Sequence, residues 1–457
     1  MQKTAPPSDG IILRRRRLAA FPSDQIRRLR EMLARRPFLK NVSIMLTGSA
    51  GGQMISILLS PVLTRLYSPQ QFGILSAYSA ILAMLVVISS LRYELALPLA
   101  RGDEDAINLT VVCICALGIT TAAVGAAVFL LPAPLLAALW PVPLDRGHAT
   151  AYRMLLVSGY FCLGGYFIAL YFATRANAFR PIAKTRLAQG VIGPLTQIGL
   201  ALLGGGAPAL MIGSVVGQSA GTFGLFYTVM TGRRALLRAV SWSRVVDMAR
   251  RYIRFPLIGS WAALIDAIGG NQLLYLLITA HYSVRIAGFI FLAERIVSRP
   301  LAIVGASILH VFVGEAGQTA GAGPAKLRSR FYQVVSRQFA LAAIWGIVTN
   351  VAGASMFPIV FGAEWNDGVV YLQAISLGYL AQAVVQPVFH TLQILEKQYL
   401  AASWQIGRLV LTIAAFALGD HLGLRASWVV ASYSAVQAAS CAILVLLMAR
   451  AIQQLQR

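Results

Sequence analysis

Four arginines lie within stretches of sequence that are otherwise apolar enough to cross a bilayer. They are Arg92, Arg295, Arg299 and Arg408. An arginine at the centre of a membrane-spanning helix costs roughly 2.5 to 3.5 kcal/mol on insertion scales, so such residues are rare and face a polar cavity. Guanidinium groups bind phosphate through paired, charge-assisted hydrogen bonds. These residues therefore predict an anion site inside a membrane.

Arg295 and Arg299 are four residues apart, so a helix places both on one face. At 1.5 Å per residue they would lie roughly 14 to 20 Å below the outer end of their helix, which is mid-membrane. Pro300 removes a backbone donor directly after them and can kink the helix. The pair could clasp a diphosphate, or it could be structural and form ion pairs with Glu294 or Asp266.

Arg92 and Arg408 have polar neighbours of different kinds. Arg92 is predicted in the inner third of a helix, where it could face the cavity or extend to the membrane interface. Glu94 would then lie about 200° around that helix and could brace a gate. Arg408 has Trp404 and Gln405 beside it, a combination suited to a sugar diphosphate.

Asp266 lies near the middle of another predicted span. An isolated carboxylate there takes up a proton or finds a cation, so we expect coupling to H⁺ or Na⁺, with an ion pair to an arginine as the alternative. Glu94 and Glu294 are further candidates for coupling or gating. His310 and His390 could bind protons or simply pack. The four cysteines lack paired spacing, so no disulfide, metal or cofactor site is expected.

The composition indicates an integral membrane protein. The 457 residues are 58% hydrophobic and 12% charged, against about 25% charged in soluble domains. A bilayer core needs about 20 apolar residues per helix. Twelve spans are predicted, over 40–63, 72–97, 106–131, 151–173, 187–204, 208–230, 257–280, 286–312, 331–355, 369–392, 400–419 and 426–448.

Basic residues predict the orientation, because Lys and Arg accumulate in cytoplasmic loops. With the N-terminus inside, the cytoplasmic segments hold 30 Lys and Arg and the outer segments only five. Both termini are therefore predicted to be cytoplasmic. The net charge of +23 follows this topology without any nucleic-acid motif, so nucleic acid is not an expected partner.

A weak internal echo suggests two related halves. At an offset of 215 residues, Ser68 matches Ser283 and Gly73 matches Gly288, each pair at the outer start of a long helix. Transporters place substrate between such repeats. The predicted organisation is a basic cytoplasmic tail (1–38), a six-helix bundle (39–230), a basic cytoplasmic linker (231–256), a second six-helix bundle (257–448) and a cytoplasmic tail (449–457).

Several motifs occur together between Leu58 and Leu109. They are Ser60-Pro61, the stretch Thr64 to Tyr67, Phe72-Gly73, the stretch Arg92 to Glu94, and an acidic loop before Asn108. In kind and order they resemble the opening helices of bacterial oligosaccharide flippases, the Wzx-type members of the polysaccharide transporter family. The segment 287–312 resembles the corresponding helix of that family's second half.

The resemblance implies the multidrug/oligosaccharidyl-lipid/polysaccharide (MOP) exporter fold, with two six-helix bundles around a central cavity. It further implies movement of undecaprenyl-diphosphate-linked oligosaccharide from the cytoplasmic to the periplasmic leaflet of the inner membrane, for O-antigen, capsule or exopolysaccharide. Membrane lipids and the polymerase and export machinery are the partners it implies. Members often carry 14 helices, and the extra pair could hold the lipid tail; twelve are predicted here.

Two other classes of protein compete with this interpretation. A cation-coupled multidrug exporter shares the fold but needs acidic cavity walls, whereas four arginines against Glu94, Asp266 and Glu294 leave the membrane interior net positive by one. An enzyme needs an outer active site. The longest outer loop, about 132–150, offers no paired carboxylates or nucleophile constellation, so no enzyme is expected.

Overall fold

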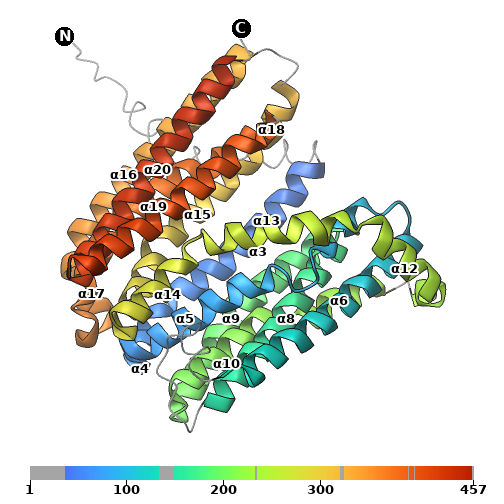
Figure 1. Ribbon diagram of the computed structural model, residues 1–457, viewed down its shortest axis with the longest axis horizontal. Coiled ribbons are helices and arrows are strands. Elements are labelled where there is room, and N and C mark those ends of the chain that lie inside the picture. Colours follow the sequence, from blue (N-terminus) through green and yellow to red (C-terminus); the bar gives the residue numbers. More distant parts are fainter. Residues whose placement is uncertain are drawn as a thin grey trace, which may run out of the picture.

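Two helical bundles make up the part of the chain that the computed structural model describes, which is 37–132, 149–231, 234–319, 324–389, 391–395 and 397–454. No strand occurs within these ranges. In Figure 1 the blue-to-green helices and the orange-to-red helices approach each other on the left and diverge toward the upper right. Residues 1–36 of the predicted cytoplasmic tail and most of the predicted outer loop lie outside the described residues, as does His390.

The first bundle contains α3 (Pro37–Leu58), α4 (Ser60–Leu66), α5 (Pro69–Val86), η1 (Tyr93–Leu99), α6 (Asp103–Leu130), α8 (Ala149–Arg175), α9 (Phe179–Leu202), α10 (Gly206–Ser219) and α11 (Thr222–Met230). The basic segment that follows forms η2 (Arg234–Ala239) and α12 (Trp242–Arg251). The second bundle contains η3 (Phe255–Gly259), α13 (Ser260–Ile268), α14 (Gln272–His281), α15 (Val284–Thr319), α16 (Pro324–Phe361), η4 (Ala363–Trp365), α17 (Gly368–Val385), η5 (Gln386–Val388), α18 (Thr391–Ile394), α19 (Gln398–His421) and α20 (Ala426–Gln454).

The helices account for the predicted membrane spans. Among the described residues, eight helical segments are long and apolar enough to cross a bilayer, and a bent pair, Phe255–Ile268 with Gln272–His281, makes up to a ninth. The remaining three predicted spans fall on α3, α9 and α15, which are not among these segments. The expectation of an all-helical, multi-pass membrane protein is confirmed.

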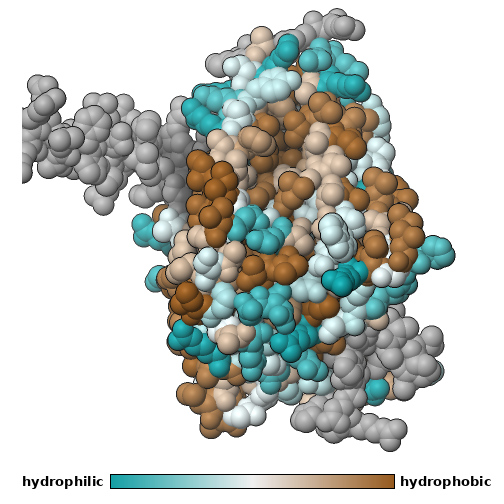
Figure 2. All heavy atoms as spheres, turned by 90° about the vertical axis from the view of Figure 1, so that its left-hand side faces the viewer, coloured by the Kyte–Doolittle hydropathy of each residue, from teal (hydrophilic) through white to brown (hydrophobic). Residues whose placement is uncertain are grey.

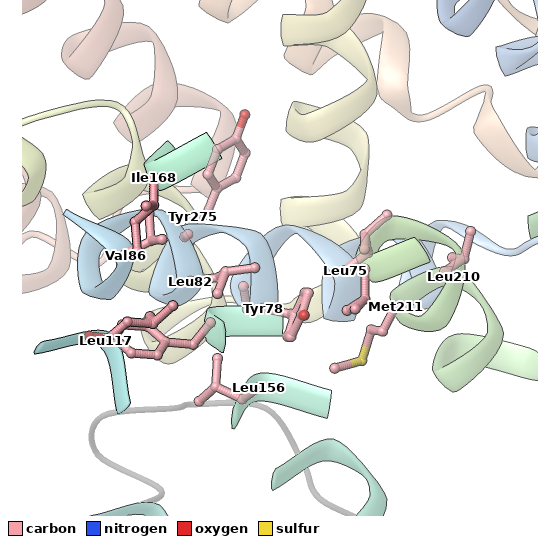
Figure 3. Packing of buried hydrophobic residues seen from close by; sticks show 14 of the residues in the cluster. Leu75, Tyr78, Leu82, Val86, Leu117, Leu156, Ile168, Leu210, Met211 and Tyr275 are labelled. Carbon is pink, nitrogen blue, oxygen red and sulfur yellow. The ribbon is translucent and has the colours of Figure 1, made fainter. Parts of the chain in front are cut away.

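Close packing holds each bundle together. Side chains of α5 interdigitate with those of α6, α8 and α10, and Tyr78 lies in the middle of this cluster, where its hydroxyl donates to the Leu155 carbonyl at 3.1 Å (Figure 3). On α3, Gly48 and Gly52 face the backbone of α9 with no room for a side chain. Such contacts matter in lipid, because burial of apolar surface does not by itself favour one helix partner over the surrounding hydrocarbon.

The bundles meet where α5 crosses α15. A side chain at Gly73 would overlap the Val284 carbonyl, and a side chain at Gly288 would overlap the Pro69 carbonyl. Val284 and Pro69 are themselves 215 residues apart, so the two contacts are equivalent under the same offset as the sequence echo. The glycines of the echo therefore form one reciprocal contact between the halves.

Further contacts between the bundles surround this crossing. Trp365 is fully buried, its ring packs edge-on against Phe72 at 5.1 Å, and its indole nitrogen donates to the Thr64 carbonyl at 2.9 Å. Arg65 donates to the Ile359 carbonyl at 3.3 Å. We call this end of the molecule the closed end. Figure 2 views the molecule from that side and shows polar residues across the middle of the face, between apolar patches.

The second and seventh predicted spans are among those that are interrupted, which corrects the expectation of continuous helices. The second span leaves α-helical geometry after Val86, and Leu91 and Arg92 adopt left-handed backbone angles with φ of 52° and 65°. Thr120 donates to the Ser89 carbonyl at 2.5 Å, so a neighbouring helix satisfies part of the unwound backbone. The seventh span bends by 51° between α13 and α14.

We predict that Gly288→Ala destabilises the protein. The added methyl group would meet the Pro69 carbonyl, and overpacking of this kind costs about 1–3 kcal/mol. The matched control is Gly118→Ala on α6, where an added methyl group meets nothing within 4 Å. Thermal unfolding in detergent should show a lower midpoint for Gly288→Ala alone; equal midpoints for both variants would contradict the tight crossing.

Candidate functional site

A cavity between the two bundles contains three of the predicted site residues. It has a volume of about 120 Å³ and is lined by Gln53, Ser56 and Ile57 of α3 and by Phe291, Glu294, Arg295 and Arg299 of α15. Because α3 belongs to one bundle and α15 to the other, relative motion of the bundles would change the shape of this cavity.

The two arginines of α15 have different environments. Arg295 donates to the Ser56 carbonyl at 2.8 Å and also to the Ser56 hydroxyl, so α3 holds it in place. Arg299 is exposed on the cavity wall, and Glu294 lies near enough to interact with it electrostatically. The sequence analysis gave an ion pair with Glu294 or Asp266 as the alternative role for Arg295. None of the described ion pairs joins Arg295 to either carboxylate, and its described partner is Ser56.

Arg408 lies in a second cavity, within the C-terminal bundle. This cavity has a volume of about 450 Å³. Its lining comprises Asn271, Ser298, Ala302, Leu309, Tyr379, Gln382, Ala383, Val385, Gln386, Phe389, Trp404, Arg408 and Cys441. Arg408 donates to the Gly269 carbonyl at 2.9 Å, and its guanidinium carbon lies 4.9 Å from the centre of the Trp404 ring. Trp404, which the sequence placed near Arg408, thus stacks against its guanidinium.

The two cavities are neighbours across α15. Glu294 lines the first cavity, and Tyr379, which lines the second, lies close enough to Glu294 to interact with it electrostatically. Ser298 and Arg299 are adjacent in sequence and line the second and first cavities respectively. The two cavities therefore border the same stretch of α15.

Asp266 is exposed on α13 and accepts a hydrogen bond from the Gln405 side chain at 2.7 Å. Its described partner is therefore the amide of Gln405. The ion pair with an arginine of a neighbouring helix, which was the predicted alternative to ion coupling, is not among the described contacts. Its role in ion coupling stays a prediction.

Arg92 and Glu94 lie in the unwound segment after α5 and do not line the cavity that contains Arg295. Glu94 is buried and accepts a hydrogen bond from the Ser90 hydroxyl. The Nε atom of Arg92 is buried without a hydrogen-bond partner among the described residues, and Arg92 approaches Gly259 of the seventh span. The helical geometry expected for this pair is wrong, because the left-handed residues redirect the chain.

The sequence analysis missed the uncharged polar residues of the site. Gln53 and Ser56 are three residues apart on α3, and Asn271 and Gln382 form reciprocal side-chain hydrogen bonds of 3.2 Å across the second cavity. The available signal was the occurrence of amides within apolar spans, since a buried amide in lipid needs a partner. The side chain of His310 lies outside the described residues.

Solved structures similar to this chain are membrane transporters of the MOP superfamily. An inward-facing multidrug-resistance MATE family transporter matches with a TM-score of 0.62 at 14% identity, over 91% of this chain and 98% of that chain. An outward-facing MATE family transporter gives 0.56 at 14% identity, over 92% and 97%. A MOP transporter from Pyrococcus furiosus gives 0.55 at 14% identity, over 92% and 97%. At these identities the matches establish the fold: this is a MOP-type transporter fold.

The family follows from the sequence itself. Residues 62–370 match the model of a family described as "Polysaccharide biosynthesis protein", and the chain belongs to that family. A search of curated proteins finds no match. The resemblance to Wzx-type flippases of the MOP superfamily is confirmed at the level of family and fold.

We predict that Arg299→Ala abolishes transport and that Arg299→Lys restores part of it. Arg299 is the exposed cation of the cavity between the bundles. Lys keeps the positive charge but cannot form the bidentate hydrogen bonds that a guanidinium makes with a phosphate. Arg295→Ala should also abolish transport, with a lower thermal midpoint because the Ser56 contacts are lost. Arg285→Ala, which removes an exposed cation at the closed end, is the matched control. Wild-type rates for the Arg299→Ala variant would remove this residue from the site.

We predict that Asp266→Asn removes the response of transport to a pH gradient. Asn can still accept the hydrogen bond from Gln405 but cannot bind a proton. Transport should be measured in proteoliposomes with and without the gradient. Asp247→Asn on α12 is the control; an unchanged response in Asp266→Asn would exclude proton coupling at this residue.

Proposed function

We propose that this transporter is a flippase for undecaprenyl-diphosphate-linked oligosaccharides, which it moves from the cytoplasmic to the periplasmic leaflet of a bacterial inner membrane. The products would serve O-antigen, capsule or exopolysaccharide synthesis. The observation that carries this proposal is the placement of Arg295 and Arg299 in a cavity whose wall comes from both bundles. The match to a polysaccharide biosynthesis family supports the same class of substrate.

The charge of the two cavities favours an anionic substrate. Their linings contain Arg295, Arg299 and Arg408 but a single carboxylate, that of Glu294, which leaves a net charge of +2. A diphosphate would offset this charge through charge-assisted hydrogen bonds in a region of low dielectric constant. Trp404 and the amides of the second cavity offer a stacking surface and hydrogen bonds suited to a sugar.

The cycle we propose is alternating access, in which one bundle rocks against the other. The closed end carries the residues predicted to be periplasmic, so the cavity would open toward the cytoplasm, with both termini on that side. The higher TM-score for the inward-facing transporter, 0.62 against 0.56, supports this orientation. The prenyl tail would remain in the lipid while the diphosphate head crosses through the cavity.

A multidrug exporter is the second candidate, because two of the similar structures are described as multidrug-resistance transporters. The arginines count against it, since an organic cation is repelled by a positive cavity. The MOP transporter from Pyrococcus furiosus is described as having a binding pocket of reverse polarity that suggests a different function. That precedent supports a change of substrate charge within this fold.

Coupling and partners are part of the proposal. No cofactor is needed by this cycle, and a gradient of H⁺ or Na⁺ could drive it through Asp266, with Glu94 or Glu294 as gating groups. The lipid-linked product would pass to the polymerase and export machinery on the periplasmic side.

We predict that proteoliposomes containing the wild-type protein translocate a lipid-diphosphate-linked oligosaccharide placed in the outer leaflet of inside-out vesicles. Its appearance in the lumenal leaflet should be followed alongside ethidium, an organic cation. Transport of the oligosaccharide and not of ethidium is the expected result. Uptake of ethidium without any flipping would instead support the multidrug exporter.

A further inference from the structure

The break in the seventh span places the end of a helix midway along a predicted membrane span. α13 ends at Ile268 and α14 begins at Gln272, with a bend of 51° between them. The last carbonyl groups of a helix lack partners within it and carry partial negative charge. In secondary transporters, such broken-helix ends coordinate the coupling cation.

In this chain a side chain supplies the cation. The guanidinium of Arg408 donates from α19 to the carbonyl of Gly269, directly at the break, at 2.9 Å. Trp404, one turn earlier on α19, stacks against the guanidinium and is itself fixed by a 2.7 Å hydrogen bond to the Ser440 carbonyl. The cation is therefore held in place on two sides.

The other side chains that line the cavity beside Arg408 are neutral. Asn271, directly after the break, accepts a hydrogen bond from Tyr433 at 3.2 Å and is bonded to Gln382, which in turn donates to Gln437 at 3.4 Å. None of the residues that line this cavity is acidic. The described residues thus give Arg408 a helix-end carbonyl and no carboxylate.

Arg408 also retains capacity for a second partner. Its Nε atom is buried without a hydrogen-bond partner among the described residues, beside a cavity of about 450 Å³. Charge-assisted hydrogen bonds to a phosphate oxygen are about twice as strong as neutral ones, and guanidinium can make two of them in parallel. An anion in this cavity would compete with the Gly269 carbonyl.

We propose that Arg408 is a built-in cation that ties the break between α13 and α14 to α19, and that an anionic group of the substrate withdraws it from Gly269 and frees the break to move. This inference rests on the proposed function in requiring an anionic substrate. It gives substrate binding a direct effect on the helix that follows the linker, and it makes a dissolved cation at this break unnecessary.

The test is hydrogen–deuterium exchange of the break, followed by mass spectrometry of a peptide covering residues 264–276, in the purified full chain. Arg408→Ala should exchange about tenfold faster there than wild type, because one charge-assisted hydrogen bond is lost. Inorganic pyrophosphate should accelerate exchange of this peptide in wild type and cause no further change in Arg408→Ala. Unchanged exchange of α20 in the variant shows that it is folded.

Arg299→Ala is the matched control, since it removes a cavity arginine that does not contact Gly269. It should exchange like wild type at the break without ligand. Arg408→Gln keeps a neutral hydrogen-bond donor and replaces Arg408→Ala in the experiment if that variant does not fold. In Arg408→Gln, pyrophosphate should no longer accelerate exchange of the peptide. Wild-type exchange in Arg408→Ala, or no response of wild type at pyrophosphate concentrations that saturate binding by calorimetry, overturns the inference. The exchange experiment does not measure transport. If the protein fails it but still translocates the lipid-linked oligosaccharide, this inference is wrong and the proposed function is unaffected.

Discussion

The direct contact of two backbones, where α5 crosses α15, is the constraint on which the arrangement of the bundles depends. Gly73 and Gly288 allow this approach because any side chain would collide with a carbonyl of the other helix. In lipid, helices associate through such close packing rather than through burial of apolar surface. Trp365 and Phe72 fill the space around the crossing. The halves join at this end and their helices diverge toward the other (Figure 1), an arrangement that suits the proposed alternating-access cycle.

Charge inside the membrane explains the next level of organisation. Arg295 and Arg408 each donate to a backbone carbonyl of a neighbouring helix, at Ser56 and at Gly269. A buried charge without a partner would be far more costly, so these contacts tie cations to helices that could move. Arg299 is different, because it is exposed on the cavity wall. Because a buried charge needs a partner, Arg295 and Arg408 bind backbone carbonyls and help to organise the cavities. Arg299, which is exposed, is available to a ligand.

The breaks in the helices coincide with these charges. Arg92 lies in the left-handed turn after α5, and Arg408 binds the end of α13. Non-helical backbone at membrane depth is tolerated only where protein or a water-filled cavity satisfies its polar groups. Thr120 does so for Ser89, and Arg408 does so for Gly269. Unwound segments next to cations are thus consistent with a protein that changes shape around an anion.

Membrane class, the approximate positions of most spans, the arginines within them and the correspondence of Gly73 with Gly288 could all be predicted from the amino-acid sequence. These properties are encoded locally, as runs of hydropathy, isolated charges and a repeated spacing. Only the tertiary structure decided that Arg295 binds Ser56, 239 residues away, that Asp266 binds Gln405, and that the second and seventh spans are broken. The reason is physical: hydropathy reports which residues avoid water, whereas partners and helix breaks depend on which backbone groups a distant helix brings within hydrogen-bonding distance.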